Sequence, residues 1–261
     1  MTTLREKLAS GRRLFGTHVN LTDHRICEAL GRVGFDYLWI DTEHTSTDYK
    51  ELEIHLIAGQ STGTPVIVRI PWNDPVLAKR VLEMGPDGIV FPMVNNASEA
   101  KAAMDSCLYP PDGTRGFGPF RAIQYGILDA EEYVRLKSKE MCRFVQIESR
   151  QAVENLEHMA DVPYLDGFIL GPCDLSGSVG SLLSLYNNET DHLIDRAIAS
   201  AHAKGKPIGL SFGSDSEENL SHWLNKGIDF LSSCTDMGFI IGGAQRMLNT
   251  MKRLDANEHM G

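Results

Sequence analysis

The chain has 261 residues, of which 42% are hydrophobic and 23% are charged, which is the usage of an ordinary globular protein. This composition excludes a disordered chain, a collagen-like repeat and a disulfide-dense scaffold. The 35 acidic residues outnumber the 25 lysines and arginines, and the formal net charge of −10 disfavours nucleic acid and anionic membranes as partners.

The N-terminal segment is charged and lacks the apolar core of a signal peptide. No apolar run approaches the roughly 18 residues that a membrane-spanning helix needs. The five cysteines cannot all pair within one chain, and none forms a C-x-x-C motif, which favours reduced thiols. We therefore expect a cytoplasmic protein without disulfides or a structural zinc site.

Eight short apolar runs alternate with longer stretches along the chain. Each run is too short for a core helix and is bounded by glycine, proline or polar residues, which is typical of buried parallel strands. The predicted strands span residues 14–19, 37–40, 66–70, 88–94, 144–147, 167–170, 208–212 and 230–233.

The stretches between the strands carry helical spacing and plausible boundary signals. Asp74 followed by Pro75 is typical of an N-cap and a first helical residue. Gly59, Gly85 and Gly205 lie where helices are expected to end.

Eight strand-then-helix units in about 250 residues predict a single-domain (β/α)8 barrel over residues 1–261, with an open doubly wound sheet as the alternative. The interval between the fourth and fifth strands is longer than the others. Its segment 109–126 is rich in glycine and proline, and we expect an ordered functional loop there.

Barrel active sites lie at the C-terminal ends of the strands. Polar residues occupy that end of four predicted strands: the run 41–44, Arg69, the pair Gln146 and Glu148, and Asp174. If the fold is correct, these side chains converge on one face.

Glu148 and Asp174 follow adjacent strands, and Mg²⁺ binds to one or two protein carboxylates while keeping several waters. The two acids are therefore either metal ligands or caps of the helices that begin beside them. No lysine lies at a predicted strand C-terminus, so a Schiff-base mechanism lacks its lysine, and no phosphate-binding glycine motif occurs.

Arg69 lies within an apolar strand, where a buried charge needs a partner. It either pairs with Asp41 or Glu148, or holds a substrate carboxylate or a developing oxyanion. His44 is either a solvated loop histidine or a base whose imidazole is held by a nearby acid.

Several motifs together resemble the HpcH/HpaI family of class II, metal-dependent pyruvate aldolases. The resemblance runs in order through nearly the whole chain, and the motifs VRIPWNDP and GPCDLS are the most specific. The matching segments are IDTEH (40–44), VRIPWNDP (68–75), GIVFPMV (88–94), YPPDGTRGFG (109–118), VQIES (145–149) and DGFILGPCDLSGSVG (166–180).

The resemblance implies a barrel whose last helix is exchanged between subunits, usually in a hexamer. It also implies an enzyme that cleaves 2-oxo-4-hydroxy acids reversibly to pyruvate and an aldehyde. By the same resemblance, Glu148 and Asp174 match the metal ligands, and Arg69 matches the residue that stabilises the enolate. Gln146 and the backbone of Cys173 and Asp174 match the pyruvate contacts.

His44 matches the family's general base. Glu83 matches an acid, Asp in relatives, that reaches this histidine from an adjacent subunit, and Asp41 is the alternative partner. The expected ion is Mg²⁺ or Mn²⁺, with Co²⁺ or Zn²⁺ as substitutes. Arg115 and Arg121 either order the long loop or bind a distal carboxylate of the aldehyde.

Two other functions remain open from the sequence. One is a citrate-lyase-like enzyme that acts on acyl-CoA esters, and macrophomate-synthase-like decarboxylases share part of the same pattern. The other is a non-catalytic barrel that binds a 2-oxo acid.

Overall fold

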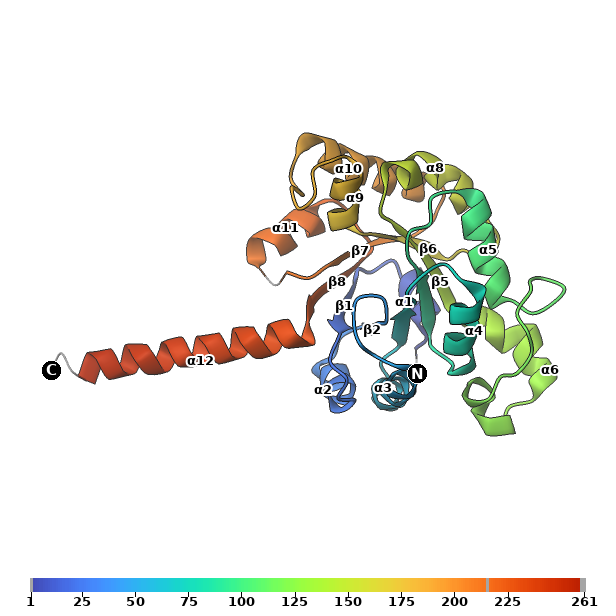
Figure 1. Ribbon diagram of the computed structural model, residues 1–261, viewed down its shortest axis with the longest axis horizontal. Coiled ribbons are helices and arrows are strands. Elements are labelled where there is room, and N and C mark those ends of the chain that lie inside the picture. The colour runs from blue at the N-terminus through green and yellow to red at the C-terminus, as the bar shows by residue number, and fades with distance from the viewer. Residues whose placement is uncertain (1, 215, 259–261) are drawn as a thin grey trace.

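Eight parallel strands close into a barrel in chain order, which confirms the predicted fold and excludes the open sheet (Figure 1). The computed structural model describes residues 2–214 and 216–258. The ends of the strands differ from the prediction by three residues or fewer. The strands are β1 (Leu14–Val19), β2 (Tyr37–Asp41), β3 (Val66–Arg69), β4 (Gly88–Phe91), β5 (Cys142–Ile147), β6 (Gly167–Leu170), β7 (Ile208–Phe212) and β8 (Phe230–Thr235).

Helices follow the strands and cover most of the outside of the barrel (Figure 1). A short N-terminal helix, α1 (Leu4–Ala9), precedes β1. The helices after the first seven strands are α2 (Arg25–Val33), α3 (Tyr49–Ser61), α4 (Pro75–Glu83), α5 (Ala97–Cys107), α8 (Arg150–Ala160), α9 (Pro172–Ser178) with α10 (Asn188–Ala203), and α11 (Glu217–Asn225).

Three of the four helix boundaries predicted from local signals are confirmed. The Asp74 carboxylate accepts hydrogen bonds from two backbone amides of the first turn of α4, and Pro75 is its first residue. Gly85 and Gly205 follow helix ends with positive φ. The stop predicted at Gly59 is wrong, because α3 continues to Ser61. A Cβ at Gly59 would lie 2.7 Å from Val66 Cγ2, so this glycine lets α3 approach β3 closely.

The apolar side chains form two concentric cores. The larger core lies between the strands and the surrounding helices. The smaller core fills the inside of the barrel, as is usual for this fold, and α1 contributes Leu4 to it. Its members are Leu4, Leu14, Tyr37, Trp39, Ile67, Val90, Cys142, Phe144, Ile169 and Phe230.

The long interval after β4 returns to the N-terminal end of the barrel. Following α5, the chain forms the 3-10 segment η1 (Arg121–Gly126), α6 (Ala130–Glu132), the π-helical turn η2 (Tyr133–Lys137) and α7 (Ser138–Glu140). The η1 segment packs on the end of α4, where a Cβ at Gly85 would lie 3.1 Å from the Cα of Ala122. The loop 109–126 is therefore at the opposite end of the barrel from the strand C-termini.

The last helix, α12 (Asp236–Glu258), projects away from the barrel instead of packing along it (Figure 1). It carries exposed apolar side chains along much of its length, including Ile241, which is 61% exposed. Phe15, an outward-facing residue of β1, is also exposed. Among the described residues, no helix combines the length and the hydropathy needed to cross a membrane.

Candidate active site

A cavity of about 710 Å³ opens at the C-terminal ends of the strands. The polar residues predicted at these ends do converge on it: Asp41, His44, Arg69, Gln146, Glu148, Cys173 and Asp174 all line its wall. The strands position them because parallel strands in a closed barrel bring all their carboxyl ends to one rim.

Arg69 is buried at the end of β3 and pairs with two acids from the end of β2. Its guanidinium donates to both oxygens of Asp41, at 2.9 and 2.6 Å, and lies 3.0 Å from the Glu43 carboxylate. Burial alone would raise the pKa of Asp41, but the hydrogen bonds and charge of Arg69 lower it below its ordinary value. A third donor atom of Arg69 lies 3.5 Å from the Gln146 side-chain oxygen, on the side of the cavity.

Glu148 is a buried carboxylate at the end of β5, only 5% exposed. It accepts hydrogen bonds from the Met93 amide and from the Gln146 side chain, both at 2.9 Å. Burial raises its pKa to about 7, and the nearby charges of Glu43 and Asp174 act in the same direction. A Cβ at Gly171 would lie 2.7 Å from its Oε1, so β6 approaches the carboxylate closely only because glycine stands there.

Neither Glu148 nor Asp174 acts as the N-cap of the helix beside it. Ser149 caps α8, because its hydroxyl accepts from the Ala152 amide. Gly171 is the N-cap residue of α9, and Asp174 lies within the first turn.

Burial raises the pKa of Glu43 as well, to about 7, and the Asp41 and Asp174 charges add to the effect. The rim therefore holds more buried acid than Arg69 neutralises.

His44 is an exposed side chain at the mouth of the cavity, and its nearest acid is Glu43, at 3.6 Å. Asp41, the alternative partner, is engaged by Arg69. Glu83 ends α4 at the far end of the barrel, where it pairs with Arg115 at 3.2 Å. Within one chain, Glu83 and His44 are therefore not brought together.

Cys173 lines the cavity but is not an activated nucleophile. Its thiol is half-buried, and burial together with the Asp174 charge raises its pKa. A thiol with a raised pKa is protonated at neutral pH and is therefore a weak nucleophile.

Five polar residues that line the cavity are absent from the set predicted from the sequence: His18, Asn20, Ser211, Ser214 and Thr235. Two of them, His18 in β1 and Ser211 in β7, contact each other. The His18 Nε2 lies 2.8 Å from the Ser211 hydroxyl. A signal for them does exist, because each is a polar residue inside an otherwise apolar strand. The sequence does not reveal that both face inward at the rim, since this depends on the strand register.

Arg115 and Arg121 lie with the loop 109–126, away from this cavity. Arg115 is buried against Glu83 and the Tyr109 ring, with its guanidinium carbon 4.5 Å from the ring centroid. Arg121 donates to the Gln60 side chain at 2.7 Å and to the Met84 carbonyl. Within one chain, both arginines order the loop.

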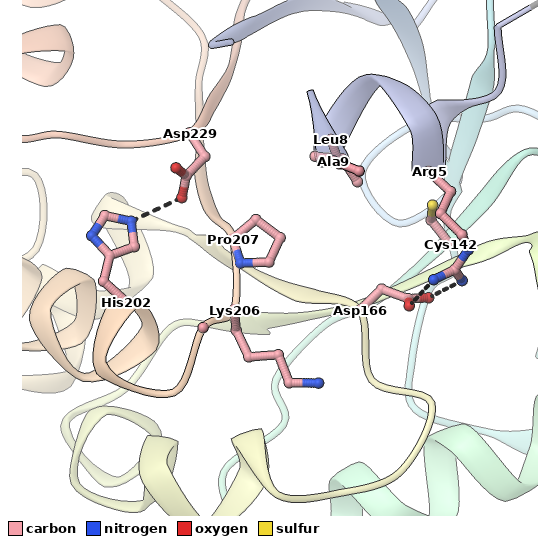
Figure 2. A pocket seen from close by; sticks show the side chains of 10 residues that line it. Arg5, Leu8, Ala9, Cys142, Asp166, His202, Lys206, Pro207 and Asp229 are labelled. Carbon is pink, nitrogen blue, oxygen red and sulfur yellow. Dashed lines mark hydrogen bonds and ion pairs between the residues drawn. The ribbon is translucent and has the colours of Figure 1, made fainter. Parts of the chain in front are cut away.

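A second cavity, of about 620 Å³, lies at the N-terminal ends of β5 to β8 (Figure 2). Figure 2 shows two pairs of side chains that point toward each other, Arg5 with Asp166 and His202 with Asp229. Arg5 donates to both oxygens of Asp166, at 2.6 and 2.9 Å, and His202 lies 2.9 Å from Asp229. Lys206 donates to a backbone carbonyl at 2.6 Å. These contacts stabilise the N-terminal end of the barrel (the closed end), opposite the C-terminal end where the cavity with Arg69 lies (the open end).

Comparison with known proteins identifies the family of this chain. The sequence matches the HpcH/HpaI aldolase/citrate lyase family over residues 14–241. The chain belongs to this family.

Its curated relatives include a 2-dehydro-3,6-dideoxy-6-sulfogluconate aldolase from Pseudomonas putida, 36% identical over 93% of this chain and 94% of that protein. A 4-hydroxy-2-oxo-heptane-1,7-dioate aldolase from Salmonella typhimurium is 33% identical over 93% of this chain and 92% of the relative. A family member of known structure, from Burkholderia cenocepacia J2315, superposes with a TM-score of 0.90 at 25% identity, covering 97% of this chain and all of that one.

Proposed function

We propose that this protein is an aldolase that reversibly cleaves 2-oxo-4-hydroxy acids to pyruvate and an aldehyde. The observation that carries the proposal is the convergence of Arg69, Gln146, Glu148 and Asp174 on one cavity at the strand C-termini. A cation, a neutral amide and two carboxylates at one rim suit a reaction in which an oxo acid gains negative charge. The names of the relatives support the same reaction class.

The residues present fit a divalent ion. Among the described residues, no group of three or more histidine, cysteine and acidic side chains forms a complete metal site. Glu148 and Asp174 alone suffice for Mg²⁺ or Mn²⁺, because such ions bind oxygen ligands and keep waters that a substrate displaces. The buried Glu148 carboxylate lacks a cation of its own, since Arg69 pairs with Asp41 and Glu43. A bound ion supplies Lewis acidity that stabilises negative charge on the oxo acid.

The protein's own groups perform the remaining steps. Arg69 holds its positive charge at the cavity wall, where it stabilises the oxygen of pyruvate as the enolate forms. Gln146 is fixed by Glu148, at 2.9 Å, and orients the acid for the reaction. In the cleavage direction, His44 accepts the proton of the 4-hydroxyl group, the C3–C4 bond breaks to release the aldehyde, and protonation at C3 gives pyruvate.

Hydrogen–deuterium exchange at C3 of pyruvate tests the proposal without knowledge of the aldehyde. The exchange is followed by NMR in D₂O, after EDTA treatment and again after addition of Mg²⁺ or Mn²⁺. We expect exchange that depends on the added ion. A folded, metal-bound protein that leaves C3 unexchanged would contradict the proposal, and turnover of acyl-CoA esters alone would favour the citrate-lyase-like alternative.

We also propose that the protein is a homo-oligomer in which α12 packs on a neighbouring copy, in a hexamer as the family resemblance implies. The exposed apolar residues of α12 support this, because contiguous exposed apolar surface marks contact sites. The position of Glu83 agrees with it, since one of its carboxylate oxygens is buried without a hydrogen-bond partner among the described residues. We propose that Glu83 completes the His44 site of an adjacent subunit.

Substitution on α12 tests the assembly. Ile241→Asp places a charge among its exposed apolar residues, whereas Thr250→Asp adds the same charge at an exposed polar position of the same helix. In sedimentation velocity we expect Ile241→Asp to shift the protein to smaller species and Thr250→Asp to retain the assembly. A monomeric wild-type protein would contradict the proposal.

A further inference from the structure

One wall of the active-site cavity holds a histidine whose protonation the geometry defines. His18 Nδ1 lies 2.8 Å from the backbone carbonyl oxygen of Cys234, which can only accept a hydrogen bond, so Nδ1 carries the proton. Burial lowers the pKa of His18, and the imidazole is therefore neutral at pH 7. Its Nε2 then bears a lone pair, and the Ser211 hydroxyl, 2.8 Å away, donates to it.

The backbone around His18 and Ser211 fixes the position of this pair. The register between β1 and β8 shifts between Gly16 and His18, which is a β-bulge at the rim of the barrel. Within the bulge, Cys234 adopts a φ of +60°, in the left-handed region that non-glycine residues rarely occupy. Its carbonyl oxygen is the one that contacts His18. A bulge of this kind re-aims a backbone group, and here the group sets the tautomer of the histidine.

The consequence concerns the Ser211 oxygen. Because its proton is committed to His18, the hydroxyl oxygen offers the cavity only its lone pairs. Asn20, on the same wall, has a side-chain oxygen without a hydrogen-bond partner among the described residues. This wall therefore presents hydrogen-bond acceptors that lack donors.

Among the described residues, the side chains that line this wall are uncharged, and the Asp236 carboxylate accepts from the backbone amides of Asn20 and Leu21 instead of lining the cavity. The wall's polar side chains come from β1, β7, β8 and the loops that follow β1 and β7, on the described part of the chain, and are His18, Asn20, Ser211, Ser214 and Thr235. The charged groups of the cavity lie on the ends of β2, β3, β5 and β6, where the oxo acid is proposed to bind. A cation suited to a distal carboxylate or sulfonate is missing from the lining that the described residues provide.

We propose that the Ser211 oxygen, oriented by His18, accepts a hydrogen bond from a hydroxyl group of the aldehyde, so that the enzyme prefers uncharged hydroxyaldehydes. The inference rests on the proposed aldolase function and names the class of its second substrate. Ser211 contacts the substrate, whereas His18 is a positioning residue that acts through Ser211.

Matched pairs of aldehydes test the inference in the aldol addition of pyruvate. Acetaldehyde and glycolaldehyde form one pair, and propanal and glyceraldehyde form the other, with succinate semialdehyde as an anionic comparison. We expect the wild type to favour the hydroxylated member of each pair in kcat/KM and to favour glyceraldehyde over succinate semialdehyde. We expect Ser211→Ala to reduce the hydroxyl preference by about tenfold, the loss of one well-made hydrogen bond.

Ratios within one variant separate recognition from damage, because a general loss of activity affects both aldehydes equally. Ser233→Ala is the matched control: it lies on the neighbouring strand, its hydroxyl donates to the Ser214 carbonyl, and it does not line the cavity. We expect it to keep the wild-type ratio. His18→Leu should reduce the ratio as Ser211→Ala does, and the double variant should add nothing further, since both changes remove one interaction.

The outcomes distinguish the two proposals. A wild-type enzyme that exchanges pyruvate C3 and adds it to aldehydes, but keeps its hydroxyl preference in Ser211→Ala, would overturn this inference alone. A higher kcat/KM for succinate semialdehyde than for glyceraldehyde would also overturn it. Failure of the wild type to exchange C3 would overturn both the aldolase function and the inference.

Discussion

The two ends of the barrel hold cavities of similar size, about 620 and 710 Å³, that differ in the balance of their charges. At the N-terminal end, Figure 2 shows two closed pairs, Arg5 with Asp166 and His202 with Asp229. At the C-terminal end, Arg69 is the guanidinium at the rim, and it faces four acids: Asp41, Glu43, Glu148 and Asp174.

This difference separates acids that are paired with a cation from acids that lack one. At the closed end, Asp166 is paired with Arg5 and Asp229 with His202. At the open end, buried acid exceeds buried base, and the pKa values of Glu43 and Glu148 rise to about 7 as a result. Such an imbalance costs stability unless a cation or substrate compensates it.

The largest effect on activity is expected at Arg69, and Arg5 at the other end of the barrel serves as its control. Arg69→Ala should lower kcat about 10³-fold, because it removes the fixed positive charge beside the developing enolate. It also leaves Asp41 buried without its partner, at a cost of about 3–5 kcal/mol. Arg69→Lys keeps the charge without the two-pronged geometry, and circular dichroism with urea titration shows whether each variant folds.

Arg5→Ala is the matched control, since Arg5 also contacts both oxygens of an aspartate but is 42% exposed at the closed end. We expect no measurable change in kcat and a loss of about 1 kcal/mol in the free energy of unfolding. Equal losses of activity in both arginine variants would remove the distinction between the two ends.

Glu148→Gln is expected to have the next largest effect. The substitution keeps the shape of the side chain but removes the negative charge of a proposed metal ligand. We expect activity and Mn²⁺ affinity to fall by at least about 100-fold, a bound set by losses seen when groups around a metal are changed. Calorimetric titration with Mn²⁺ and pyruvate C3 exchange measure the two quantities. Wild-type values for both would show that Glu148 is not a ligand.

Glu83 is the exception to this difference between the two ends, since it lies away from the open end yet is proposed to act in catalysis. His44→Ala and Glu83→Gln should each lower activity by about 100-fold, toward the lower range of acid–base contributions. If Glu83 serves the His44 of another copy, co-assembly of the two variants creates some sites with both native residues. We expect partial recovery of activity in the mixture, and none in either variant alone.

Two results would limit Glu83 to its pairing with Arg115. One is wild-type activity in Glu83→Gln. The other is a mixture of the two variants that stays as inactive as its components, although sedimentation shows that they assemble together.

Much of the fold and part of the site follow from local sequence. The eight strands are visible because each is a short apolar run between turn residues, and the helix start at Asp74 and Pro75 is set by nearest-neighbour hydrogen bonds. The convergence of Arg69, Gln146, Glu148 and Asp174 follows from the barrel itself. Their metal-binding and catalytic roles stay predictions that the experiments above address.

Which side chains of the site pair with one another is visible only in the tertiary structure. Asp41 and Glu43, not Glu148, pair with Arg69 because the register of β2 and β3 brings Asp41 opposite Arg69. The pair His18 and Ser211 depends on how β1, β7 and β8 meet around a bulge.

The same holds for segments whose direction no local pattern encodes. The composition of the loop 109–126 predicts a functional loop, but the loop follows α5 and therefore lies at the closed end of the barrel. The helical pattern of α12 is local, whereas its departure from the barrel depends on what packs against it. The strands, most helices and their order along the chain follow from the sequence, because periodic burial and helix caps depend on residues that are only a few positions apart. Partners and directions belong to the tertiary structure, because they arise between residues that are far apart in the chain.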